Sequence, residues 1–161
     1  MESYAESLFA EAQLPADEPT SPILLARRHG VQVEWARLPM PYAFTRAQNI
    51  PEVHRILVND TFAAPEARVA CAAAFAHLRA LDHDPQALAL AILLPRAALL
   101  KHAPGFRFDE NEIANYFCVP PHVVALRIYM HRRALPLQSA TRMRAAVAVN
   151  DSEHLAASFS R

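Results

Sequence analysis

The segment from Pro65 to Leu81 constrains the fold of this chain more than any other. It is rich in alanine, and its only polar side chains after Glu66 are Arg68, His77 and Arg79. Alanine is the strongest helix former, and a helix that is apolar nearly all round is stable only when other elements cover it. The segment therefore predicts a long central helix on which the rest of the domain packs.

Three short segments before this helix have the features of β-strands. Val31, Val33 and Trp35 alternate with Gln32, Glu34 and Ala36, which is typical of a half-buried strand. Prolines between the segments mark loops and sheet edges. We expect a small antiparallel sheet, with its second and third strands at Tyr42–Arg46 and His54–Asn59.

Helical segments lie on both sides of the predicted sheet. Residues 2–13 carry apolar side chains at helical spacing. Ser21, Pro22 and Gly30 supply an N-cap, a first-turn proline and a stop for a helix at residues 22–29. Further helices are predicted at Pro85–Leu93, Arg96–His102, Glu110–Phe117 and Pro121–Arg133. The last two flank a tight turn and resemble a helix-turn-helix.

These elements predict an α+β fold class. A small antiparallel sheet packs on the central helix, and a helix-turn-helix-like pair follows at the C-terminal side.

Charge and cysteine content narrow the class of protein. Lys+Arg and Asp+Glu are both 16, so the net charge is about zero, which disfavours binding to nucleic acid through bulk charge. The two cysteines, Cys71 and Cys118, lie in apolar runs and are expected to be buried thiols. Residues 1–13 lack the basic region of a signal peptide, and apolar runs such as Ala87–Leu94 are too short to span a bilayer. We therefore expect a soluble cytoplasmic protein.

Four passages, taken in order, carry a family resemblance that covers about Leu8 to Leu135. They are a helix–glycine–strand opening at Ile23–Val33, a strand at Arg55–Asn59, a Leu-Leu-Pro motif at Ala91–Pro95, and a paired-helix motif at Ile113–Pro120 with Val123–Ile128. The order and spacing of these passages resemble the ImmA/IrrE family of zinc peptidases.

The resemblance implies a catalytic motif, Arg-x-x-x-Ala-His-Glu-x-x-His, on the central helix. Two histidines four residues apart lie on one helical face and bind one zinc ion, and the glutamate takes a proton from the zinc-bound water. Arg68 and His77 match this motif, whereas Ala73 replaces the first histidine and Ala74 replaces the glutamate. The third ligand of the family, a glutamate on the next helix, corresponds to Asp84.

Alanine offers neither a lone pair nor a titratable group, so the resemblance predicts a pseudo-peptidase without catalytic residues and without a bound metal. Loss of the general base alone costs roughly 10²–10⁴ in rate. One alternative is an active zinc endopeptidase that cleaves a transcriptional repressor and uses an altered ligand set of His77, His83 and Asp84. The other interpretation of these three residues is structural, with Asp84 as the N-cap of the helix that begins at Pro85.

A second alternative is a DNA-binding regulator. Arg127, His131, Arg132 and Arg133 gather towards the end of the helix at Pro121–Arg133, where they are candidates for contact with nucleic acid or a protein partner. Cations at a helix C-terminus are also favoured by the helix dipole, so packing and protein contact remain open as explanations.

Three aromatic residues of the predicted strands, Trp35, Tyr42 and Phe44, are candidates for a peptide-binding edge. The family resemblance motivates this hypothesis, because family enzymes hold substrate near this sheet. Ordinary core and surface aromatics are the alternative.

With the resemblance, the sequence predicts three parts: a zincin-like peptidase-fold domain at residues 1–104, the helix-turn-helix-like pair packed on it at 105–135, and a tail at 136–161. The predicted function is regulatory. The chain is expected to bind a protein partner, such as a repressor or a related regulator, in stress-response or mobile-element gene control. No cofactor is expected unless the altered zinc site exists.

Overall fold

The computed structural model describes the backbone of residues 1–46, 54–80, 83–106 and 109–134, and the side chains of these residues other than 44–46 and 131–134. The predicted tail at 136–161 lies outside the described residues. Met1–Arg127 form one compact unit and Ile128–Arg161 belong to a second, so the architecture given below is that of the first unit. The domain boundary predicted after residue 104 stays a prediction.

The helices lie close to where the sequence predicted them. Each of the two aspartates that precede a helix caps it, and Gly30 adopts a positive φ of 73° directly after the second helix. A short 3-10 helix at Ala103–Phe106 was not predicted. The α-helices are α1 (Glu2–Glu11), α2 (Pro22–Arg28), α3 (Ala64–Arg79), α4 (Pro85–Leu93), α5 (Arg96–His102), α6 (Glu110–Phe117) and α7 (Pro121–Ala134).

The sheet is mixed, and the prediction of an antiparallel sheet was wrong. Its strands are β1 (Gln32–Ala36), β2 (Tyr42–Arg46) and β3 (His54–Asn59), in the order β1-β3-β2. β2 and β3 pair antiparallel, whereas β1 pairs parallel with β3. Side chains alternate with a period of two in both kinds of pairing, so the sequence pattern located the strands but did not give their relative direction. The α+β class is confirmed.

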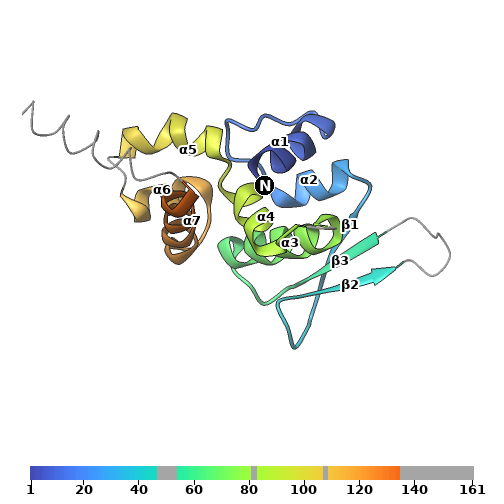
Figure 1. Cartoon of the computed structure of the whole chain (residues 1–161). Coiled ribbons are helices and arrows are strands. Elements are labelled where there is room, and N and C mark those ends of the chain that lie inside the picture. The colour runs from blue at the N-terminus through green and yellow to red at the C-terminus, as the bar shows by residue number, and fades with distance from the viewer. Residues whose placement is uncertain (47–53, 81–82, 107–108, 135–161) are drawn as a thin grey trace, which may run out of the picture. The chain divides into compact units, whose positions relative to one another are not determined.

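Helix α3 occupies the centre of the described unit. It contacts α4, α2, β3 and β2, and Figure 1 shows it lying alongside the sheet with α4 next to it. Alanines at 70, 72, 74 and 76 are all buried, and Phe75 is fully buried among them. Small side chains allow neighbouring backbones to approach closely, so an alanine-rich helix can be covered on several sides at once.

The most apolar stretch of the chain is a broken helix pair. Pro85–Phe106 is long and apolar enough to cross a membrane by composition, but 56% of its apolar window is buried inside the protein. The helix is interrupted at Leu94 and Pro95, whose backbone angles are not helical. Leu88 to Leu93 are all buried, so α4 is a core helix of this unit.

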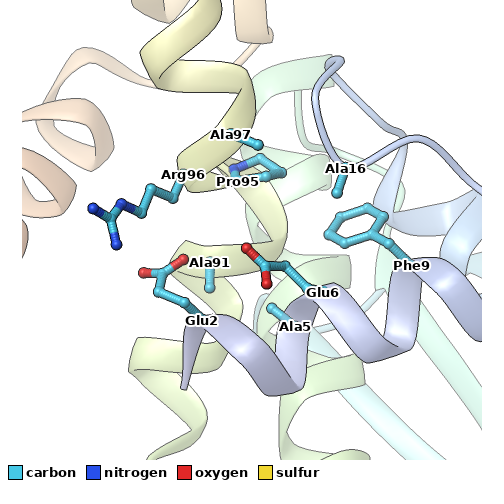
Figure 2. A pocket seen from close by; sticks show the side chains of 9 residues that line it. All are labelled: Glu2, Ala5, Glu6, Phe9, Ala16, Ala91, Pro95, Arg96 and Ala97. Atoms are coloured by element: carbon cyan, nitrogen blue, oxygen red, sulfur yellow. The ribbon is translucent and has the colours of Figure 1, made fainter.

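An ion pair joins the beginning of α1 to α7. Arg127 is 6% exposed, and its guanidinium lies 2.6 Å from a carboxylate oxygen of Glu2 and donates through Nε to the backbone carbonyl of Leu94 at 3.0 Å. Figure 2 shows Glu2 projecting from α1 towards the α4–α5 junction around Pro95. The side chain of Arg127 therefore connects α7 to the start of α1 and to the α4–α5 junction, which are far apart in the sequence.

We expect Arg127→Ala to lower the free energy of unfolding by about 2–4 kcal/mol, because it leaves a buried carbonyl and a partly buried carboxylate without their donor. Urea unfolding followed by circular dichroism measures this loss. Arg28→Ala, at an exposed position at the end of α2, is the control and should change stability by less than about 0.5 kcal/mol. Equal effects of the two substitutions would contradict a structural role for Arg127.

Candidate functional site

The two alanines that the family resemblance aligns with the zinc-binding motif have different surroundings. Ala74, in the place of the family's glutamate, is 0% exposed and lies in the core. Ala73 is partly exposed, and His77, one helical turn further on, is exposed. Residues four apart share a helical face, so Ala73 and His77 mark the side of α3 that reaches the surface. At these two positions α3 presents one methyl group and one imidazole towards the surface.

The imidazole of His77 is held by its own helix and by β2. Its Nδ1 lies 2.8 Å from the carbonyl oxygen of Ala73 and 3.3 Å from the hydroxyl of Tyr42. A carbonyl only accepts hydrogen bonds, so this geometry assigns the proton to Nδ1. The rings of Tyr42 and His77 lie 6.1 Å apart between centroids. His77 thus connects the exposed side of α3 to the sheet.

The other two candidate ligands have structural contacts. Asp84 is the N-cap of α4, and its Oδ1 accepts from the backbone N–H of Gln86 at 2.9 Å. The ring of His83 packs against Tyr4 of α1, with 4.9 Å between centroids. The hydroxyl of Tyr4 donates to the carbonyl of Arg79 at 2.8 Å, so this contact ties α1 to the end of α3.

These residues do not fit a zinc ion. Within the part of the chain that the structure describes, no three His, Cys, Asp or Glu side chains are grouped closely enough to hold a metal. Two of the positions that the motif reserves for a ligand and a base carry methyl groups, and Asp84 uses a carboxylate oxygen to cap a helix. A catalytic zinc site needs three protein ligands around an open position.

Arg68, which matches the family motif, has a packing role. It donates from a terminal nitrogen to the carbonyl of Thr20 at 3.0 Å and so links α3 to the loop before α2. Its Nε is buried without a hydrogen-bond partner among the described residues, and this burial lowers the pKa of the guanidinium. Burial also raises the pKa of the nearby Cys71 thiol to about 12, so this thiol is protonated at neutral pH.

The cationic cluster predicted on the last helix is described only in part. Arg127 is buried, and its guanidinium forms an ion pair with Glu2 and a hydrogen bond with the carbonyl of Leu94. The side chains of His131, Arg132 and Arg133 lie outside the described residues. Contact of these residues with nucleic acid or a partner stays a prediction.

Two of the three aromatic candidates share one face of the sheet. Trp35 and Tyr42 both pair with Val58, on opposite sides of β3. Val58 is fully buried, whereas Trp35 is 50% exposed at the outer strand β1. The side chain of Phe44 lies outside the described residues. Tyr42 is the aromatic residue that lies beside His77.

A surface cluster that the sequence analysis missed holds the loop between α1 and α2. Lys101 Nζ lies 2.8 Å from an oxygen of Asp17 and 2.5 Å from one of Glu18, and His102 Nε2 lies 3.2 Å from Glu18. Hydrogen bonds from Lys101 lower the pKa values of both carboxyls. The partners are more than 80 residues apart, so no local pattern indicates the cluster. It connects the loop to α5.

The pocket drawn in Figure 2, between α1 and the α4–α5 junction, has a volume of only about 10 Å³. This is room for about one water molecule and for no larger ligand.

Comparison with protein-family models, with curated proteins and with solved structures gives no match for this chain. Membership of the ImmA/IrrE family stays a prediction from the sequence.

We expect Asp84→Ala to lower the free energy of unfolding by about 1 kcal/mol, because α4 loses its N-cap. Asp84→Ser is the matched control, since serine caps a helix but is a poor zinc ligand. Urea unfolding of both variants, with and without added zinc, distinguishes a role of Asp84 as helix cap from a role as zinc ligand. A loss that is equal for alanine and serine and that requires zinc would identify Asp84 as a ligand.

A glutamate at position 74, where the family resemblance places the catalytic base, should destabilise the fold. We expect Ala74→Glu to lower the free energy of unfolding by about 3–5 kcal/mol at pH 8, because burial disfavours a charged carboxylate. The folded pKa of the new carboxyl is raised above its unfolded value of about 4.3, so the loss grows as the pH rises above that value.

Ala73→Glu, at the partly exposed neighbouring position, is the control. It should lower the free energy of unfolding by less than Ala74→Glu does at every pH. Urea unfolding at pH 5 and pH 8 measures both variants. Equal losses for the two substitutions, or a loss that shrinks towards pH 8, would contradict the burial of position 74.

Proposed function

We propose that this chain is a catalytically inactive, metallopeptidase-like protein that binds a protein partner in the cytoplasm. By its sequence resemblance, the setting is stress-response or mobile-element gene control, and the partner is a repressor or a related regulator. Its proposed architecture is a former zinc-peptidase helix packed on the sheet, with α6 and α7 as a helix-turn-helix-like pair.

One observation carries the proposal of inactivity. Ala74, at the position of the general base, is 0% exposed in the core of the unit. A peptidase needs a base at this point that reaches a water molecule in an open cleft. A buried methyl group supplies packing in its place, and Asp84 and His83 have structural contacts of their own. The altered ligand set therefore gains no support from the geometry.

The partner is proposed to bind where α3 reaches the surface next to β2. Tyr42, Ala73 and His77 form this α3–β2 surface, and none of the three is fully buried. Binding and catalysis use different groups, so a surface that has lost its chemistry can still recognise a chain. Tyrosine is frequent among the residues that dominate binding energy, because it combines apolar area with a hydroxyl group.

The helix pair is proposed to act in packing or protein contact. Arg127 supports this assignment, because its guanidinium is taken up by Glu2 and by the carbonyl of Leu94. Contact with DNA phosphates would require cations that face the solvent.

We expect Tyr42→Ala and His77→Ala each to weaken partner capture by about tenfold, which is typical of residues at the centre of an interface. Leu100→Ala is the matched control, because Leu100 is 64% exposed on α5 and is no part of the α3–β2 surface. The measurement is affinity capture with each folded variant, followed by quantification of the retained protein by mass spectrometry.

Unchanged capture by both α3–β2 variants would contradict the proposed surface. Cleavage of a captured protein that stops when a chelator is added would contradict the proposed inactivity.

A further inference from the structure

No described strand pairs with the outer edge of β1. β1 forms one edge of the β1-β3-β2 sheet and pairs with β3 alone among the described strands. An open edge presents backbone N–H and C=O groups that can pair with a strand from another chain. Proteins usually block such edges with proline, lysine or bulges. Gln32–Ala36 contains neither proline nor lysine, and its single charged residue is Glu34.

The backbone groups that point outward follow from one hydrogen bond. The carbonyl of Ala36 accepts from the N–H of Asp60 at 3.0 Å, so Ala36 directs its backbone groups towards β3. Successive residues of a parallel strand alternate in this respect, so Glu34 also faces β3. Val33 and Trp35 therefore direct both of their backbone groups away from the sheet.

A shallow groove lies at β1. Its lining includes the five consecutive residues Gly30–Glu34, together with Arg27 of α2 and Arg55 of β3. Successive side chains of a strand point to opposite faces of the sheet. Consecutive residues can therefore line one groove only where their backbone is also accessible. The groove therefore includes residues from both faces of β1, which indicates that backbone of this strand is accessible.

We propose that a second copy of this chain docks on this edge, with the two β1 strands antiparallel and the twofold axis passing through Glu34. In this register Val33 of each copy lies opposite Trp35 of the other. An antiparallel pair of this kind exchanges two hydrogen bonds, so the two symmetric pairs use all four outward-facing groups of Val33 and Trp35 on each strand. The sheet becomes continuous across the two copies.

The side chains of β1 are self-complementary in this register. Trp35 is 50% exposed in the single chain, and Val33 is nearly buried on the same face of the strand. Pairing places the indole of one copy beside Val33 of the other, and aromatic pairs with β-branched residues stabilise antiparallel strands. The two contacts are related by symmetry, as an isologous interface requires.

The charges at the centre of the interface also balance. The two Glu34 carboxylates face each other, which by itself is unfavourable. Each carboxylate lies 3.6 Å from Arg55 Nε of its own chain, and the same Nε donates to the side chain of Gln32 at 3.0 Å. Two negative and two positive charges thus meet at the axis, and changing the sign of either partner leaves four like charges.

Sedimentation equilibrium of the full chain tests the proposal. The wild type is expected to be a dimer, and Glu34→Arg and Arg55→Glu are each expected to weaken self-association by at least about tenfold. An equimolar mixture of the two variants is expected to form dimers again, because four positive charges then become two that face two negative ones. Arg28→Glu, a charge reversal outside the groove, should leave the dimer intact.

Circular dichroism confirms that each variant is folded before its molar mass is measured by sedimentation equilibrium. A wild-type chain that stays monomeric at high micromolar concentration would overturn the proposal. A dimer that survives both single charge reversals, or one that the mixture does not restore, would place the interface elsewhere and equally overturn it. The α3–β2 surface carries none of the substituted residues, so partner capture is read independently.

Discussion

The burial of α3 is the constraint on which the rest of the structure depends. Alanines on several sides of this helix let α4, α2 and the sheet approach it closely, and Phe75 is fully buried among them. Close packing of this kind tolerates a methyl group but not a charged side chain. The alanines that let α3 pack at the centre of the unit carry no side-chain atom that could bind a metal.

The polar groups around α3 follow from the same constraint. Arg68 ties the helix to the loop at Thr20, and Asp84 caps the next helix where the family resemblance places a ligand. His77 is exposed beside Tyr42 of β2. The side chains that the family resemblance would direct to one ion thus have packing, capping and surface contacts in the described part of the chain.

Local sequence signals predicted the positions of most helices and strands, because the starts and ends of these elements depend on neighbouring residues. Asp84 and Pro85 predict the start of α4, and Gly30 marks the end of α2 through its positive φ. Strand direction has no such signal, and the parallel pairing of β1 with β3 was missed for that reason. Contacts between distant segments, such as Glu2 with Arg127, were also missed, because nothing in either local sequence specifies the partner. The motif positions follow from spacing in the sequence, but the burial of Ala74 and the exposure of His77 could be seen only in the fold.

Metal content is the most direct measurement of the central claim that α3 is a packing helix without a zinc site. The full chain, purified without a histidine tag and dialysed mildly, can be analysed for zinc by mass spectrometry with inductively coupled plasma ionisation. Our account predicts far less than one zinc ion per chain. One tightly held zinc ion per chain, lost on substitution of His77, would contradict it.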